Sequence, residues 1–168
     1  MISPNIKINI EQSGEDFKLK YKFNREENTI TEDITALNTG FGITYVLPIL
    51  IAILSAQKDS IILIENPEAH IHPKGQAILM ELLAKAVANG IQIILESHSD
   101  HIINGSLVAV NNGLITPDLL SIYYFNREEH NHVAVSHPLE VSKNGHIKRP
   151  PKGFFDQIDI DLKTLTGF

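Results

Sequence analysis

Several residue types that would indicate particular chemistries are scarce or missing in this sequence of 168 residues. Cysteine is absent, which excludes disulfide bonds, thiolate metal sites and a cysteine nucleophile. Basic residues are in the minority, with 14 Lys and Arg against 20 Asp and Glu, and the formal charge of -6 has the wrong sign for a module that coats a nucleic-acid backbone. A hydrophobic content of 43% excludes a disordered chain, and a chain of this length buries roughly 70% of its unfolded surface. The sequence therefore predicts one soluble globular domain.

A hydrophobic segment long enough to cross a membrane is also missing. The longest apolar run, residues 43–56, contains Thr44, Pro48 and Ser55 and is shorter than the roughly 17 to 25 residues of a membrane-spanning helix. We expect it to form a buried helix with Pro48 near its first turns, where proline is best tolerated. Residues 1–10 lack the basic and then apolar pattern of a secretory signal, so we expect a cytoplasmic protein without membrane contact.

Alternating and continuous apolar patterns together indicate an α/β fold. Apolar residues alternate with polar ones over 6–10 and 17–23, which predicts two half-buried antiparallel strands. Continuous apolar runs at 60–65 and 91–96 are typical of strands covered on both faces, as in a parallel sheet. Helices are predicted at 43–56, 74–88 and 99–110. Because helices alternate with strands, we expect a parallel sheet whose ligands bind at the carboxyl ends of its strands.

Beyond this core the sequence predicts another pair of strands and a basic tail. The strands are expected at 119–125 and 133–135. Residues 143–152 carry four Lys or Arg, and we interpret them as a solvated loop, with nucleic-acid contact as the alternative. The expected parts are an N-terminal β-hairpin or meander, a central lobe and a tail, at residues 1–35, 36–140 and 141–168.

Polar residues gather beside the predicted elements at three places. Glu65 ends the first buried strand and is followed by Asn66 and a proline-locked turn, so its carboxylate can hold a divalent cation against a bound phosphate. His98 follows the second buried strand, where it can reach a terminal phosphate. The Gly-rich segment 38–42 precedes a helix, and its backbone N–H groups favour an anion. The three places together predict a phosphate site.

The order of these motifs resembles the C-terminal half of an ABC-type P-loop ATPase of the SMC and OLD-nuclease kind. More narrowly, it resembles the prokaryotic AAA-family ATPases that carry a DUF3696 region, and the resemblance covers residues 36–160. The matching segments are the signature-like Asn38-Thr-Gly-Phe-Gly42, the Walker B strand 61–67, the D-loop-like His70-Ile-His-Pro73, the switch-histidine segment 97–101 and the DUF3696-like tail 151–156. The resemblance implies a P-loop-NTPase-like α/β fold with a parallel sheet core, flanking helices and peripheral antiparallel strands.

Carried over to this sequence, the resemblance implies ATP and Mg²⁺ as ligands. Glu65 would be the Walker B acid on Mg²⁺, and His98 the switch histidine at the γ-phosphate. Asn38, Gly40 and Gly42 would form the signature face that closes on the ATP of a second subunit. That subunit would be a second copy or a different chain with a Walker A motif. The resemblance also implies DNA-related or phage-defence settings.

The sequence departs from the family pattern at two places. Asn66 stands where the family's general base is usually Glu, and an amide can orient a water but cannot accept its proton. Glu68, two positions further on, is the substitute candidate. The Walker A pattern G-x-x-x-x-G-K-[ST], which grips the β- and γ-phosphates, does not occur in the 168 residues. We therefore expect ATP hydrolysis only with a Walker A from another segment or chain. No TOPRIM-like nuclease segment is visible in the sequence, so we expect no DNA cleavage by this chain.

Two other interpretations stay open. Two histidine pairs, together with Glu65, Glu68 and Asp100, supply enough ligands for zinc or manganese in a metal-dependent hydrolase. These histidines are His70, His72, His98 and His101. The first pair is better explained by structural roles, since a residue at a turn can cap or pack without binding a metal. His101 and Asp100 are explained equally well by capping of the helix that follows. Alternatively, the chain is a non-catalytic, degenerate ATPase scaffold.

Overall fold

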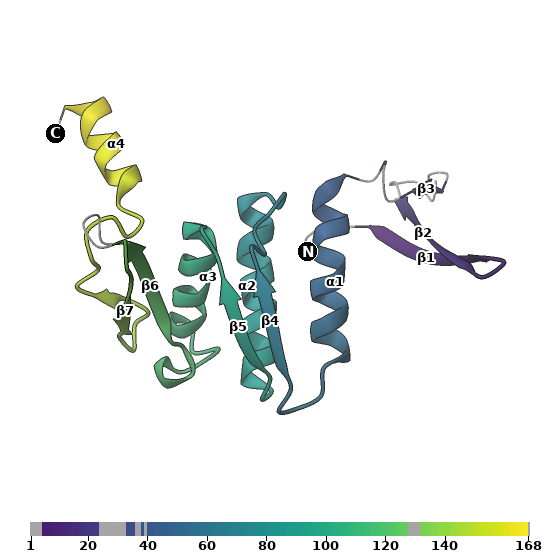
Figure 1. The fold of residues 1–168 in the computed structure, drawn as a ribbon, viewed down its shortest axis with the longest axis horizontal. Coiled ribbons are helices and arrows are strands. Elements are labelled where there is room, and N and C mark those ends of the chain that lie inside the picture. The colour runs from purple at the N-terminus through teal and green to yellow at the C-terminus, as the bar shows by residue number, and fades with distance from the viewer. Residues whose placement is uncertain (1–4, 24–32, 36–37, 39, 128–131, 168) are drawn as a thin grey trace.

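A computed structural model describes residues 5–23, 33–35, 38, 40–127 and 132–167. The strands are β1 (Ile6–Ser13), β2 (Asp16–Phe23), β3 (Ile34–Thr35), β4 (Ile61–Glu65), β5 (Gln92–Glu96), β6 (Ile122–Arg127), β7 (Ala134–Val141) and β8 (Ile147–Lys148). The helices are α1 (Phe41–Ser55), α2 (Pro73–Ala88), α3 (Asp100–Asn111) and α4 (Gln157–Thr166), with a 3-10 turn at Pro117–Leu119. These elements form an elongated molecule, with the β1–β2 hairpin at one end and α4 at the other (Figure 1).

The two continuous apolar runs form a parallel pair of strands, as predicted. Strands β4 and β5 pair in register from Ile61 opposite Gln92 to Glu65 opposite Glu96. Helix α2 connects them and lies behind them in the view of Figure 1. Side chains between the strands and the helices form the main core, which includes Val46, Ile53, Ile64, Ile71, Leu79, Met80, Leu83, Ile91 and Ile102.

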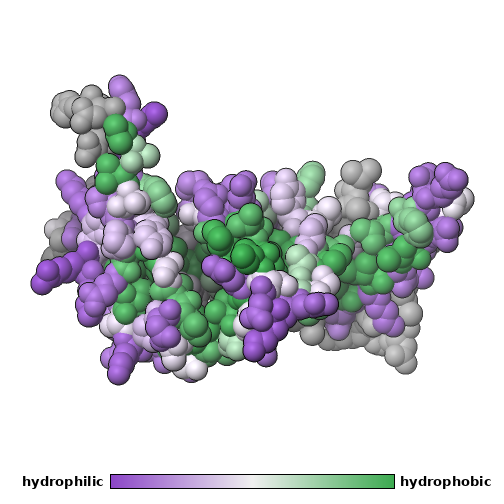
Figure 2. Space-filling model, turned by 60° about the horizontal axis from the view of Figure 1, so that its bottom comes forward, coloured by the Kyte–Doolittle hydropathy of each residue, from purple (hydrophilic) through white to green (hydrophobic). Residues whose placement is uncertain are grey.

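The expectation that β4 and β5 are covered on both faces is wrong. Leu63 is 73% exposed and Ile94 is 53% exposed, whereas Ile64, which points to the opposite face, is only 7% exposed. The cause is that the described helices leave one face of the strand pair uncovered, so alternate apolar side chains reach the surface. Figure 2 shows hydrophobic surface in this middle part of the molecule.

The apolar run at 43–56 forms α1, but the prediction of a buried helix is wrong. Val46 and Ile53 pack into the core, while the opposite side of the helix is open. Four large side chains there are between 50% and 77% exposed: Phe41, Tyr45, Ile51 and Leu54. Pro48 lies inside the helix rather than in its first turns, where it removes one backbone hydrogen bond. None of the described helices is long and apolar enough to span a membrane.

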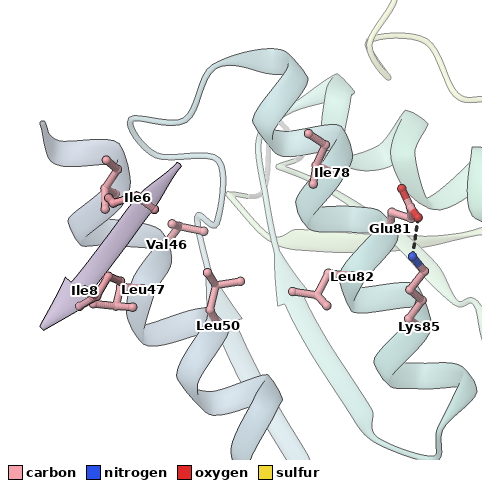
Figure 3. Close-up of a pocket in the computed structure, with 10 residues that line it drawn as sticks. Ile6, Ile8, Val46, Leu47, Leu50, Ile78, Glu81, Leu82 and Lys85 are labelled. Atoms are coloured by element: carbon pink, nitrogen blue, oxygen red, sulfur yellow. Dashed lines mark hydrogen bonds and ion pairs between the residues drawn. The ribbon is translucent and has the colours of Figure 1, made fainter. Parts of the chain in front are cut away.

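The predicted N-terminal hairpin forms, although its strands are less buried than expected. Strands β1 and β2 pair antiparallel, and Ile10 and Phe17 are each 69% exposed, because only Tyr21 on this hairpin is fully buried. The hairpin meets α1 and α2 across an apolar cavity of about 460 Å³ (Figure 3). Lys85 donates a 2.6 Å hydrogen bond to Glu81 beside it, which lowers the pKa of the Glu81 carboxyl. The cavity lining includes none of the candidate site residues.

The C-terminal part has more regular structure than the sequence predicted. Strands β6 and β7 form the expected antiparallel pair, but β7 continues to Val141 and pairs with β8 inside the predicted loop. Glu140 and Lys148 face each other there and form an ion pair. Helix α4, which was not predicted, is exposed along its length. The boundary predicted between 140 and 141 falls inside β7, and the three-part division stays a prediction.

Truncation of Leu79, a core residue of α2 with 0% exposure, tests this packing. We expect Leu79→Ala to lower the free energy of unfolding by about 2 to 5 kcal/mol, because it leaves a cavity between α2 and the strands. The matched control is Leu165→Ala on α4, where Leu165 is 82% exposed and the expected change is within about 0.5 kcal/mol. Urea unfolding followed by far-ultraviolet circular dichroism measures both. Equal losses in the two variants would contradict the assignment of the core.

Candidate functional site

The carboxyl ends of β4 and β5 bring two acidic side chains together. Glu65 and Glu96 are direct partners across the parallel pair, so both project from the same, exposed face. His98 follows β5, and its Nε2 lies 3.0 Å from Oε1 of Glu96. The His98 side chain is 81% exposed, which leaves it accessible to a ligand at the strand ends. Two carboxylates therefore end neighbouring strands at this edge, and the imidazole contacts one of them.

The chain turns sharply after Glu65 and folds back toward β5. The backbone N–H of Asn66 donates to the carbonyl of Glu96 over 3.0 Å, which extends the parallel pairing by one residue. Asn66 has φ of 46°, a left-handed conformation that asparagine tolerates better than most residues. Pro67 is buried, and the N–H of Ala69 closes the turn on the carbonyl of Asn66. These contacts fix the backbone of Asn66 at the end of the strand pair.

Glu68 spans the gap between this turn and the segment that carries His98. Its Oε1 accepts a 2.8 Å hydrogen bond from the backbone N–H of His98, and its Oε2 accepts a 2.7 Å hydrogen bond from the hydroxyl of Ser97. The Ser97 hydroxyl in turn accepts from the N–H of Ser99. The Glu68 carboxylate thus joins two segments that are 29 and 30 residues apart in the chain.

Gln76 and Ser99 form a second set of hydrogen bonds between the turn and the segment after β5. Gln76, a buried residue of α2, donates its side-chain amide to the carbonyl of Ile71 and accepts a hydrogen bond from the hydroxyl of Ser99. The Ser99 hydroxyl also accepts from the N–H of His101 and so caps α3. The helix cap is therefore Ser99, and Asp100 lies in the first turn, where its charge favours the helix dipole.

The signature-like segment lies against the D-loop-like turn. A Cβ atom on Gly42 would approach the carbonyl oxygen of His70 to 2.6 Å, so only glycine permits this contact. The His70 ring packs beside Phe41 and Tyr45, with ring centroids 5.5 and 4.8 Å away. Gly40 precedes α1 with φ of 94°, a conformation that L side chains rarely adopt. Position 39 lies outside the described residues, and the described Asn38 is exposed.

The histidines are not gathered into a metal-ligand set. His70 packs on aromatic rings, and the Nδ1 of His72 caps α2 by accepting from the N–H of Lys74. His101 lies 3.8 Å from the carboxylate of Asp100 on the exposed start of α3. Within the described part of the chain, no three His, Asp or Glu side chains are placed to hold a metal ion together. This arrangement gives the hydrolase interpretation no support.

Sequence reasoning missed the residues that connect the motifs. No role was predicted for Glu96, Ser97, Ser99 or Gln76, although each contacts a candidate or its loop. For Glu96 a signal was available, because it ends its strand at the same position as Glu65 ends β4. The pairing of Gln76 with Ser99 had no signal, since these residues lie 23 positions apart on different elements.

Comparison with known proteins identifies the family. The model of the family described as "AAA domain, putative AbiEii toxin, Type IV TA system" matches residues 3–104, which is more than half of the chain. The chain belongs to this AAA family. A second model, for a protein family of unknown function (DUF3696), matches residues 115–165. The resemblance to an AAA-type ATPase with a DUF3696 tail is therefore confirmed.

The chain is also similar to a solved structure, described as "Structural biochemistry of ATP-driven dimerization and DNA stimulated activation of SMC ATPases". The TM-score is 0.58 at 13% sequence identity, over 96% of this chain and 84% of that chain. This likeness confirms the predicted P-loop-NTPase-like fold. No curated protein matches the sequence. Family membership implies a nucleotide, usually with Mg²⁺, as the ligand class.

The contact between Gly42 and His70 can be tested by adding one methyl group. We expect Gly42→Ala to lower the free energy of unfolding by about 1 to 3 kcal/mol, because the new Cβ collides with a backbone oxygen. Leu54→Ala on the exposed side of the same helix is the control, with an expected change within about 0.5 kcal/mol. The urea midpoint of each variant provides the measurement. Unchanged stability of Gly42→Ala would show that the two segments do not touch.

Proposed function

We propose that this AAA domain supplies Mg²⁺ coordination, γ-phosphate sensing and the signature face to a dimeric, ATP-driven switch whose Walker A motif lies in another segment or chain. The observation that carries the proposal is that Glu65, Asn66 and His98 all stand at the carboxyl ends of one parallel strand pair. Glu65 and Glu96 are in register, the Asn66 N–H donates to the Glu96 carbonyl, and His98 contacts the Glu96 side chain. Open α/β sheets bind ligands at this edge. Membership of an AAA family supports a nucleotide as that ligand.

The donor set at this edge fits Mg²⁺ better than a transition metal. Glu65 and Glu96 offer carboxylate oxygens, which are hard ligands, on the exposed face of the strands. Mg²⁺ usually takes only one or two protein carboxylates and completes its coordination with waters and phosphates. When bound, the ion would neutralise charge on the phosphates. Glu65 is the residue we assign to hold it.

The neighbouring side chains have distinct proposed roles. His98 is exposed and can donate a hydrogen bond from Nε2 to a terminal phosphate, after leaving Glu96. Asn66 can orient a water through its amide but cannot take up a proton. Slow turnover is the expected consequence, and it suits a switch whose two states must each persist.

The open surfaces support a role that requires a second polypeptide surface. Asn38 and Gly40 are exposed at the start of α1, as a signature face that closes on the ATP of another subunit must be. The uncovered apolar face of β4 and β5, with Leu63 and Ile94, adjoins the same strand ends. Parallel sheets are normally covered on both faces, so we assign this face to the segment that bears the Walker A motif.

Substitution at the strand ends tests the proposal in the intact assembly, purified through a tag on this chain. We expect Glu65→Gln to reduce Mg²⁺-dependent ATP hydrolysis about 100-fold, and His98→Ala to reduce it at least about 10-fold, because each removes a group that faces developing charge. Phosphate release at saturating ATP gives the rates.

The matched controls are Glu15→Gln and His146→Ala. They alter an exposed carboxylate and an exposed imidazole away from the carboxyl ends of β4 and β5. We expect these two variants to hydrolyse ATP within about twofold of the wild-type rate. Wild-type rates in both Glu65→Gln and His98→Ala would contradict the proposal and favour a non-catalytic scaffold.

A further inference from the structure

The Glu68 carboxylate accepts two hydrogen bonds from a distant segment of the chain, which no other carboxylate in the described residues does. One of its oxygens accepts from the backbone of His98 and the other from the side chain of Ser97, at 2.8 and 2.7 Å. The residue is half-buried in the turn between β4 and α2. Its partners are the two residues directly after β5. The carboxylate therefore holds the backbone of His98, while the His98 ring is exposed and contacts Glu96.

We propose that Glu68 is a positioning residue that fixes the switch-histidine segment against the Walker B turn, and that it is not the general base. The proposal deepens the proposed function, on which the role of His98 rests. A general base needs a free oxygen within about 2.6 to 3.2 Å of the attacking water. Both oxygens of Glu68 already accept a hydrogen bond within the chain, so a proton on either would neutralise the charge that strengthens both bonds.

Further hydrogen bonds tie the turn to the switch segment. The Ser97 hydroxyl receives the N–H of Ser99, so its proton is directed to Glu68. Ser99 is held in turn by Gln76, which binds the carbonyl of Ile71 at the far end of the same turn. Both ends of the turn are thus tied to residues 97–99.

Two substitutions of Glu68 separate positioning from base catalysis. Glutamine can keep both contacts, since its carbonyl accepts from the His98 N–H and its amide donates to the free lone pair of the Ser97 hydroxyl. Alanine keeps neither contact. A base role requires a carboxylate, so glutamine and alanine would then be equally inactive. Rescue by glutamine is accordingly the signature of positioning.

The first measurement needs no nucleotide. We expect Glu68→Ala to speed amide hydrogen exchange at His98 by about 10-fold or more, because the His98 N–H loses its hydrogen bond to the carboxylate. We expect Glu68→Gln to change the exchange rate by less than about threefold, because the glutamine carbonyl still accepts from this N–H. Ser97→Ala, which removes one contact, should lie between them. Glu81→Ala on the surface of α2 is the control. Wild-type exchange in Glu68→Ala would overturn the proposal.

The second measurement is ATP hydrolysis by the intact assembly. We expect Glu68→Gln to retain at least about a third of the wild-type rate and Glu68→Ala to lose about 10-fold or more. Equal loss in both variants, with normal exchange in Glu68→Gln, would make Glu68 the base and overturn the proposal. If the wild-type assembly hydrolyses no ATP, the proposed function fails, while the exchange result still decides whether Glu68 holds the segment.

Discussion

The parallel pairing of β4 with β5 determines where the candidate residues lie. The pairing sets Glu65 opposite Glu96. Asn66, Glu68 and residues 97–99 follow one of these two closely in the chain. A slip of one residue would turn Glu65 to the opposite face, because side chains alternate along a strand. The hydrogen bond from Asn66 to the Glu96 carbonyl continues the ladder past the last strand residue. The strand register is therefore the frame on which the turn and the switch segment are built.

The same strand pair is incomplete as a sheet. Two strands with one open apolar face bury little surface, and parallel sheets are stable when both faces are covered. Leu63 and Ile94 lie on that open face, and Ile51 and Leu54 are exposed on α1. The missing Walker A pattern and the uncovered apolar surface lead to the same proposal, which is that a second polypeptide surface completes both the sheet and the phosphate site. The hydrogen bonds of Glu68 and Gln76 would then keep the residues at the ends of β4 and β5 in one arrangement before the second polypeptide surface binds.

Local patterns were sufficient to predict most elements. The apolar runs predicted β4 and β5, and the helix predicted at 74–88 forms α2. Burial was overestimated, because an apolar strand looks the same in sequence whether its second face is covered by its own chain or by another surface. The links of Gln76 with Ser99 and of Glu68 with His98 could not be predicted, since they depend on how the α2 connection folds back. Glu96 could have been predicted from its position in β5.

The account predicts that a nucleotide phosphate and its metal ion bind at the ends of β4 and β5. Paramagnetic relaxation by Mn²⁺·ATP tests this most directly, since it detects weak binding residue by residue in the amide spectrum of the protein. The account predicts selective broadening at Glu65, Asn66 and residues 96–98, with none in β6 to β8, and its loss in Glu65→Gln. Broadening that is absent, or that is centred away from these strand ends, would contradict it.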